Sequence, residues 1–291
     1  MNDLKSPYRF ACVQVNAGDD MVANINAAGG FIKSAQADGA NFVGVPENVS
    51  IMVFGSKQIR GNARSEDEHS ALQAFRDIAA QSGIWLLIGS LTVQTGDPDG
   101  RVANRSFVID SNGEIVARYD KIHMFDVDLP NGESYRESKN FRPGAQAVLA
   151  TTKFGPVGLT ICYDLRFAYL YRSLAHRGAH LLTVPAAFTR VTGEAHWHTL
   201  LRARSIETGC FVVAPAQCGT HPGDRKTFGH SLIVSPWGEV LADGGTEPGF
   251  VIAEIDPAAC EQARSMVPAL SHDREYDADP VTGPPPVRAV S

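Results

Sequence analysis

The chain has 291 residues, of which 44% are hydrophobic and 20% charged, and this composition is typical of a folded globular protein. Its net charge of −6 does not favour a nucleic-acid-binding surface, although a local basic pocket for an anionic substrate remains compatible with it. The apolar runs are far shorter than the roughly 20 residues that a membrane-spanning helix needs. We therefore expect neither a nucleic-acid partner nor a membrane partner.

The cysteine and glycine patterns exclude several further classes of protein. Five cysteines, an odd number, lack the spacing of a disulfide framework or a zinc site. Together with the absence of a signal-peptide pattern, this predicts a cytoplasmic protein with reduced thiols. His196 and His198 open a predicted helix, but the histidine spacing does not fit a metal site. No nucleotide-binding glycine motif is present, so no metal and no other cofactor are expected.

Strand and helix patterns alternate through the first half of the chain. Apolar alternation and 3–4 spacing predict a strand over 10–15, a helix over 21–37, a strand over 41–45, a helix over 69–81 and a strand over 85–93. Two further strands, over 106–109 and 115–119, flank Asn112-Gly113, which is a strong hairpin signal.

The second half repeats this order. It predicts a hairpin at 154–156, a strand that ends near Cys162, a helix over 169–177, a strand over 180–184, a helix over 196–208, a strand over 210–214 and a hairpin at 236–238. Similar order in both halves predicts one α/β domain over residues 1–276, a four-layer αββα sandwich of two mixed sheets. Residues 277–291, rich in Pro, Gly and Asp, are predicted to be a tail that is disordered or lies across a partner subunit.

Cys162 carries the strongest chemical signal in the chain. It lies where the apolar run 158–161 gives way to charged residues, just before a helix predicted to begin near Ala168. At such a turn the sulfur would face the positive end of the helix, and this field would favour the nucleophilic thiolate. The alternative is a core residue, because free cysteine is among the most buried residue types.

Glu47 and Lys121 each follow a predicted strand, at the edge where α/β sheets place their sites. Attack of a thiolate on an amide carbonyl needs a base, and a nearby carboxylate with a raised pKa can supply it. The resulting oxyanion needs a cation or aligned N–H groups, for which Lys121 and the Tyr163 N–H are suited. Taken singly, Glu47 could be a capping or ion-pairing residue and Lys121 a solvated one.

Three segments together resemble the motifs of the nitrilase, or carbon–nitrogen hydrolase, superfamily. They are Pro46-Glu47-Asn48, Asp120-Lys121-Ile122-His123 and residues 161–167, and their order and spacing match. The resemblance extends from about residue 10 to residue 276. It implies the αββα fold, a Glu-Lys-Cys triad and assembly as homodimers or larger homo-oligomers.

The resemblance also implies a second glutamate between the lysine and the cysteine. We assign this role to Glu137, as the residue that positions Lys121 and the substrate amide, and Glu133 is the competing candidate.

Further segments resemble the Nit branch of that superfamily, namely 185–189, 192–197, 201–207, 229–231 and 236–238. That branch includes omega-amidases and deaminated-glutathione amidases, and residues 216–221 are more similar to the latter. Both kinds of substrate are 2-oxo acids with a distal amide, so the resemblance implies a carboxylate-binding pocket.

Arg166 is the cation expected to bind that carboxylate, because a planar guanidinium suits it. The alternative for Arg166 is an ion pair with Asp164 or another local acid. Phe188 and Thr192 are expected to line the same pocket, together with Tyr163.

The expected activity is therefore hydrolysis of a small-molecule amide through a thioester, with deaminated glutathione as the favoured substrate. An omega-amidase acting on alpha-ketoglutaramate, a nitrilase and an N-carbamoyl-amine hydrolase are alternatives within the superfamily. A non-catalytic ligand-binding or scaffold protein is an alternative of another class, which the presence of Glu47, Lys121 and Cys162 disfavours. A serine-hydrolase elbow is not expected, because the segment 229–233 lacks its final glycine.

Overall fold

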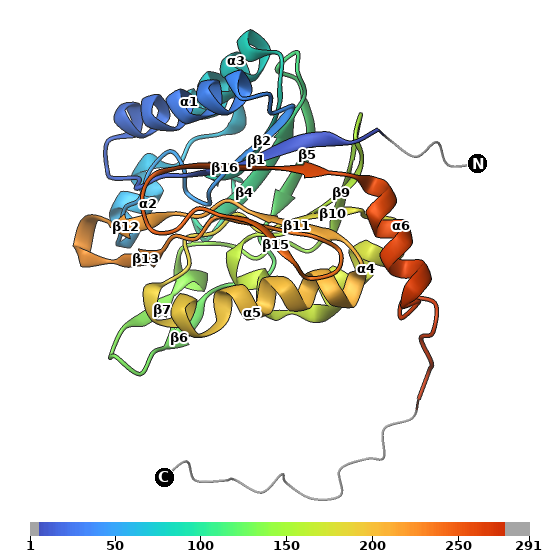
Figure 1. Ribbon diagram of the computed structural model, residues 1–291. Helices are drawn as coiled ribbons and strands as arrows, with labels where there is room; N and C mark the ends of the chain where they lie inside the picture. The colour runs from blue at the N-terminus through green and yellow to red at the C-terminus, as the bar shows by residue number, and fades with distance from the viewer. Residues whose placement is uncertain (1–5, 277–291) are drawn as a thin grey trace, which may run out of the picture.

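Two six-stranded sheets lie face to face in the computed structural model, with helices on both outer faces (Figure 1). The structure describes residues 6–276. The four-layer α/β sandwich predicted from the sequence is confirmed. The tail predicted over residues 277–291 lies outside the described residues.

The first sheet is built by the first half of the chain and one late strand. Its strands, in spatial order, are β16 (Gly249–Ile255), β1 (Tyr8–Gln14), β2 (Phe42–Val45), β3 (Trp85–Gln94), β4 (Val102–Ile109) and β5 (Ile115–Asp120). The three central strands β1, β2 and β3 run parallel, and their neighbours are antiparallel. Two helices, α1 (Met21–Ala37) and α3 (Ser70–Ser82), cover its outer face (Figure 1).

The second sheet repeats this plan with the second half of the chain. Its strands, in spatial order, are β15 (Val240–Asp243), β14 (Leu232–Val234), β11 (Phe211–Ala214), β10 (Leu181–Thr183), β9 (Gly155–Leu159) and β8 (Val148–Thr152). Here β9, β10 and β11 are the parallel strands. The helices α4 (Ala168–His176) and α5 (Arg190–Thr208) lie on the outer side of this sheet (Figure 1).

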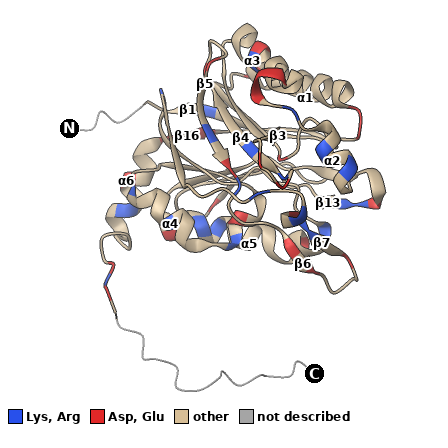
Figure 2. Cartoon of the chain, turned by 180° about the vertical axis from the view of Figure 1, so that it is seen from behind, with Lys and Arg blue, Asp and Glu red and all other residues tan. Residues whose placement is uncertain are grey.

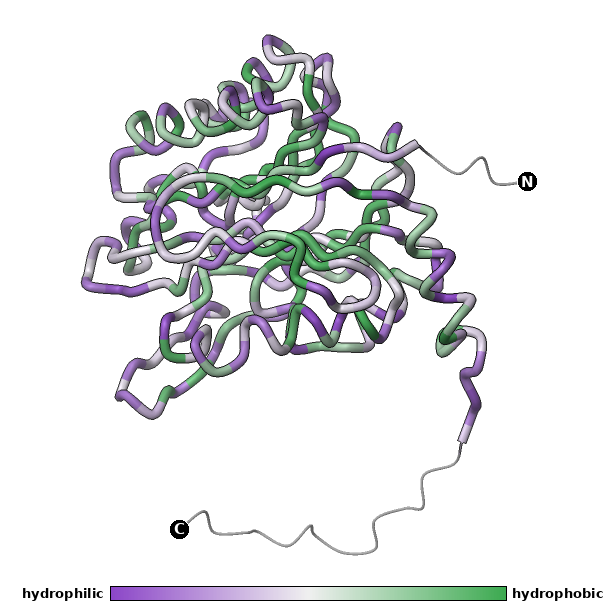
Figure 3. The backbone as a smooth tube through the Cα atoms, in the orientation of Figure 1, coloured by the Kyte–Doolittle hydropathy of each residue, from purple (hydrophilic) through white to green (hydrophobic). Residues whose placement is uncertain are grey.

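Successive side chains of a strand point to opposite faces of the sheet, and this alternation divides the apolar core into two layers. On β1, Phe10 and Cys12 belong to the core shared with the second sheet, whereas Ala11 and Val13 belong to the core beneath α1 and α3. Figure 3 shows the resulting hydrophobic colour along the central strands of both sheets. Each large aliphatic or aromatic side chain removed from water in this way contributes about 1.5–3 kcal/mol.

The structure corrects several predicted boundaries, and two of them move by four residues or more. Strand β4 begins at Val102, not at residue 106. Helix α5 begins at Arg190, not at residue 196, and so includes Thr192 and Gly193. A Cβ atom at Gly193 would lie 2.4 Å from the Phe228 side chain. Glycine is therefore required for the close contact between α5 and the neighbouring strand.

Several short elements were not predicted. They are α2 (Ser56–Asn62), the hairpin β6 (Asp126–Asp128) and β7 (Ser134–Arg136), the hairpin β12 (Cys218–Thr220) and β13 (Lys226–Phe228), helix α6 (Pro257–Met266), and the 3₁₀ turns η1 (Glu66–Glu68), η2 (Glu137–Lys139), η3 (Cys162–Arg166) and η4 (Pro222–Asp224). Basic and acidic residues are scattered over the helices and loops of the described chain (Figure 2). None of the described helices combines the length and hydropathy needed to cross a membrane.

Candidate active site

The four predicted catalytic side chains meet in one cavity of about 210 Å³. Glu47 follows β2 through Pro46, Lys121 directly follows β5, and Cys162 follows β9 at the start of η3. Glu137 comes from η2, after the β6–β7 hairpin. The cavity therefore lies where strands of the two sheets end on the same side of the sandwich.

Two glycines allow the backbone to approach closely behind this site. A Cβ atom at Gly89 in β3 would lie 2.1 Å from the carbonyl oxygen of Val45, just before Glu47. At Gly144 it would lie 2.2 Å from the carbonyl oxygen of Asp120, just before Lys121. Any side chain at either position would displace the segment that carries the functional residue.

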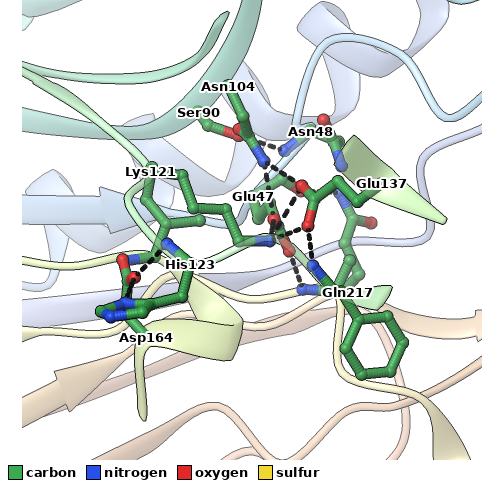
Figure 4. Close-up of polar contacts among 12 residues, drawn as sticks. Glu47, Asn48, Ser90, Asn104, Lys121, His123, Glu137, Asp164 and Gln217 are labelled. Carbon is green, nitrogen blue, oxygen red and sulfur yellow. Dashed lines mark hydrogen bonds and ion pairs between the residues drawn. The ribbon is translucent and has the colours of Figure 1, made fainter. Parts of the chain in front are cut away.

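Lys121 lies between two carboxylates (Figure 4). Its Nζ donates to Glu47 Oε1 at 2.9 Å and to the two Glu137 oxygens at 3.0 and 2.9 Å. Only 2% of the lysine and 3% of Glu47 are exposed. Buried charges of this kind are retained only when they are paired and hydrogen-bonded.

Backbone N–H groups and the Asn104 side-chain amide donate further hydrogen bonds to the carboxylates of Glu47 and Glu137. The Ala187 N–H donates to Glu47 Oε2 at 2.8 Å, and the Phe125 N–H donates to Glu137 Oε2 at 2.7 Å. Asn104 Nδ2 donates to Glu47 Oε1 at 2.9 Å, and lies 3.3 Å from Glu137 Oε1 (Figure 4). Each carboxylate is thus held in one orientation by donors from separate segments.

The ionisation of Glu47 differs from the prediction. Burial alone would raise the pKa of its carboxyl group, but the Lys121 charge and the hydrogen bonds outweigh it and hold that pKa below its ordinary value. The predicted raised pKa is therefore wrong in direction. Burial would likewise lower the pKa of Lys121, yet Glu137 and Glu47 raise it above its ordinary value. Both groups are charged at neutral pH.

Cys162 opens η3 with a φ of 48°, in the left-handed region that non-glycine residues rarely adopt. Its N–H donates to the Pro185 carbonyl oxygen at 3.0 Å, which fixes this turn against the end of β10. Burial, and next the Glu47 carboxylate beside it, raise the pKa of the thiol. The expected stabilisation of a thiolate by a helix end is wrong, because α4 begins only at Ala168 and burial dominates.

The two candidate glutamates lie in different surroundings. Glu137 binds Lys121 and lines the cavity, whereas Glu133 accepts hydrogen bonds from the Tyr135 hydroxyl and the Asn131 amide, each at 2.7 Å. Glu133 does not line the cavity. The geometry therefore places Glu137, and not Glu133, in contact with Lys121.

Asp164 connects the lysine segment to the cysteine segment. Its Oδ1 accepts from the His123 N–H at 3.0 Å and lies 2.7 Å from His123 Nδ1 (Figure 4). Its Oδ2 accepts from the Tyr119 hydroxyl at 2.6 Å and from the Ile161 N–H at 2.9 Å. Asp164 is therefore occupied by these partners, and the alternative of an Asp164–Arg166 ion pair is not formed.

Sequence reasoning missed the role of Asn104. It is a polar residue in β4 with 2% exposure, and it is followed by Arg105 and Ser106. Its backbone carbonyl also accepts from the Lys121 N–H at 3.0 Å. The sequence carried little sign of this position, because Asn104 opens the polar run Asn104-Arg105-Ser106 and precedes the strand predicted over 106–109.

The predicted substrate-binding residues divide into two groups. Tyr163, Phe188 and Thr192 line the cavity, whereas Arg166 does not. The Arg166 guanidinium lies over the rings of Tyr163 and Phe188, 5.9 and 5.4 Å from their centroids. A cation that sequence reasoning missed, Arg225, does line the cavity.

One cluster of possible metal ligands lies outside the cavity lining. His198 Nε2 and His230 Nδ1 lie 3.0 and 2.8 Å from the two oxygens of Asp243. These contacts satisfy the three side chains as mutual hydrogen-bond partners. The expectation that the protein uses no metal stays a prediction.

Comparison with known proteins agrees with this geometry. Residues 9–265 match the model of the carbon-nitrogen hydrolase family. A deaminated glutathione amidase of Synechocystis is 39% identical over 269 residues, which cover 91% of this chain and 98% of that protein.

Two solved structures are similar. The NitFhit protein of C. elegans has a TM-score of 0.85 at 35% identity, covering 93% of this chain and 66% of that one. An amidase of Nesterenkonia with an acetamide moiety covalently added at its active-site cysteine has a TM-score of 0.74 at 25% identity, covering 90% and 94%. The resemblance to the nitrilase superfamily is confirmed, and this chain belongs to the carbon–nitrogen hydrolase family.

Proposed function

We propose that this protein hydrolyses the amide bond of a small 2-oxo acid, with Cys162 as the nucleophile and Glu47 as the base. One observation carries the proposal: Lys121 is shared between Glu47 and Glu137 in the cavity that Cys162 also lines. The proposed nucleophile, base and cation therefore line one cavity.

The protonation states fit a coupled first step. The thiol of Cys162 has a raised pKa and keeps its proton, whereas Glu47 has a lowered pKa and is ionised. Glu47 accepts the proton as the sulfur adds to the amide carbonyl carbon. The carbonyl oxygen becomes an oxyanion, which Lys121 and the Tyr163 N–H stabilise.

The second step releases the amine. Glu47 returns the proton to the amide nitrogen, the carbon–nitrogen bond breaks, and the acyl group stays on Cys162 as a thioester. Glu47 then accepts a proton from water as the water oxygen adds to the thioester carbon. Collapse of this intermediate releases the carboxylic acid, and the proton returns to the sulfur.

Glu137 supports these steps without taking the proton. Both of its oxygens bind Lys121, and Oε2 also accepts from the Phe125 N–H. Its charge keeps Lys121 protonated and its geometry fixes the ammonium group. Glu137 is therefore the positioning residue for Lys121 in this proposal.

Deaminated glutathione is the substrate we favour, because the Synechocystis relative that matches 91% of the chain carries that activity in its name. The test measures amine or ammonia release from deaminated glutathione, alpha-ketoglutaramate, a simple nitrile and an N-carbamoyl amino acid. We expect the first to be hydrolysed fastest, with loss of activity in Cys162→Ala. Hydrolysis of only the nitrile or the carbamoyl compound would contradict the proposed substrate class. Hydrolysis of none would favour a non-catalytic role.

We also propose that the protein is a homodimer or larger homo-oligomer and that it is cytoplasmic. An exposed apolar surface supports the first of these: Ile206 and Trp237 are 57% and 60% exposed and border the same hollow as Val267. Light scattering after size exclusion would measure the mass, and Trp237→Glu would be expected to shift it toward the monomer. A wild-type mass equal to that of one chain would contradict the assembly.

A further inference from the structure

Two histidines and one aspartate from separate segments meet beside helix α5. His198 lies in α5, His230 precedes β14, and Asp243 is the last residue of β15. His198 Nε2 lies 3.0 Å from Asp243 Oδ2, and His230 Nδ1 lies 2.8 Å from Asp243 Oδ1. One ligand-capable atom from each side chain lies within 4.8 Å of the other two. The histidine spacing did not predict this cluster, because its members come together only in the fold.

Packing and hydrogen bonds hold the cluster in one orientation. The Phe228 ring stacks on the His230 ring with centroids 4.4 Å apart, and it meets the His198 ring edge-on at 6.0 Å. The His230 carbonyl oxygen accepts from the Trp197 indole N–H at 2.8 Å. Asp243 Oδ1 also accepts from a backbone N–H at 2.9 Å. In metal sites, neighbours of this kind orient the ligands and strengthen binding.

The two imidazole rings can present lone pairs to an ion without losing a proton. Each ring has one nitrogen facing Asp243 and a second nitrogen, Nδ1 of His198 or Nε2 of His230, that forms no hydrogen bond with the described residues. A neutral imidazole carries its proton on either nitrogen. When the second nitrogen carries the proton, the nitrogen facing Asp243 is free to bind a metal. The hydrogen-bonded cluster thus becomes a set of two nitrogen ligands and one oxygen ligand.

We propose that His198, His230 and Asp243 form a binding site for a transition-metal dication such as Zn²⁺. Imidazole nitrogen suits zinc, copper and nickel, whereas Mg²⁺ and Ca²⁺ prefer oxygen ligands. Tetrahedral zinc with bonds of about 2.0–2.1 Å places its ligand atoms about 3.3–3.4 Å apart. The observed contacts of 3.0 and 2.8 Å therefore need only small side-chain rotations. All three side chains are partly exposed, so an ion can enter and water can complete its coordination.

The bound ion stabilises the fold in this proposal. It joins α5 to the strands β14 and β15, and the unfolded chain holds no preformed site of this kind. A ligand that binds only the folded state raises Tm in proportion to the logarithm of its concentration above Kd. This inference goes beyond the proposed function and does not rest on it, because neither metal content nor Tm depends on amide hydrolysis.

The first test measures zinc binding by untagged wild-type protein from which a chelator has removed all metal. Calorimetry should show one zinc ion bound per chain, and Tm should rise by about 5 °C when free zinc is about 100 times Kd. His198→Gln and Asp243→Asn should each weaken binding by about 100-fold or more, because loss of a residue that merely orients a ligand already costs about 10- to 100-fold.

His176→Gln is the matched control. His176 Nε2 also lies 2.7 Å from a carboxylate oxygen, that of Asp273, but the third partner of this pair is Arg172 and not a second histidine. The His176→Gln protein should therefore bind zinc as tightly as the wild type. Circular dichroism would establish that each variant is folded.

Cobalt(II) reports the ligands in the unsubstituted protein, so the proposal remains testable if a variant does not fold. We expect visible absorption bands of a four-coordinate nitrogen and oxygen site, saturating at one equivalent and lost when zinc is added. Charge-transfer bands of a thiolate ligand would instead assign the ion to a cysteine and overturn the proposal.

Two further results would overturn it. Wild-type protein that binds no zinc at concentrations up to about 1 mM would leave the cluster with hydrogen bonding alone. Equal zinc affinity in the wild type and in folded His198→Gln and Asp243→Asn would place the ion elsewhere on the chain.

Discussion

The proposed catalytic centre and the wall of the surrounding cavity are built in different ways. Glu47, Lys121 and Cys162 follow strands of the two sheets, and each is less than one-tenth exposed. The wall residues Phe54 and Arg225 come instead from loops beside short elements that belong to neither large sheet. The sheets thus fix the groups that we propose to react, whereas the connecting segments line the cavity around them. Substitutions in the centre should therefore abolish the reaction, and substitutions in the wall should change its selectivity.

The largest effect should follow removal of the nucleophile. Cys162→Ala should lower kcat by about 10⁴-fold or more, because no other group can form the thioester. Cys218→Ala is the matched control, since this thiol is also buried but does not line the cavity. Steady-state amine release would measure both variants. Comparable activity in Cys162→Ala and the wild type would contradict the assignment of the centre.

The next largest effect should distinguish Glu137 from Glu133. Glu137→Gln should lower kcat by about 10²-fold or more, because Lys121 loses a carboxylate that holds its ammonium group. Glu133→Gln should stay within about 3-fold of wild type, since the Glu133 carboxylate does not line the cavity and accepts from Asn131 and Tyr135 rather than from Lys121. Equal losses of kcat in the two variants would contradict the different roles that we assign to Glu137 and Glu133.

The pH dependence of thiol alkylation tests the electrostatics of the centre. The raised pKa of Cys162 means that its thiolate fraction should increase about 10-fold per pH unit across the range from 7 to 9. Iodoacetamide labelling of the wild-type protein, followed by mass spectrometry of the peptide that contains Cys162, would measure this rate. A rate that levels off near pH 7 would instead indicate a thiolate at neutral pH.

The smallest effect concerns stability away from the site. His180 precedes β10, at the opposite end from the cavity, and burial lowers its pKa to about 4. Its folded-state pKa is below the unfolded value of about 6.5, so stability is full above pH 6.5 and is lost as pH falls toward 4, by about 3 kcal/mol. Urea unfolding at several pH values should show this loss, and His180→Gln should reduce it. An unchanged pH dependence in that variant would assign the loss to other groups.

The sequence was more informative about the centre than about the wall. Glu47, Lys121 and Cys162 each follow a predicted strand, so local patterning placed them at strand ends, and the resemblance supplied Glu137. The pKa directions of Glu47 and Cys162 were mispredicted, because they depend on burial and on Lys121, which come together only in the folded chain. Asn104 was missed because its partners are distant in sequence.

The wall could not be predicted for a related reason. Arg225 and Tyr135 meet across ninety positions of sequence, through short hairpins that carry little periodic signal. Arg166 was predicted to bind the substrate carboxylate because it is close to Cys162 in sequence, and Arg225 was not considered. The Arg166 side chain instead lies over two ring faces outside the lining.

The central claim is that Cys162 becomes acylated, and the most direct measurement is the intact mass of the protein during turnover of deaminated glutathione. Rapid acid quenching followed by peptide mapping would locate any adduct. The account predicts a mass increase equal to the acyl group on the peptide that contains Cys162, reversed as the substrate is consumed. Steady amide hydrolysis that persists in Cys162→Ala, without any adduct, would contradict it.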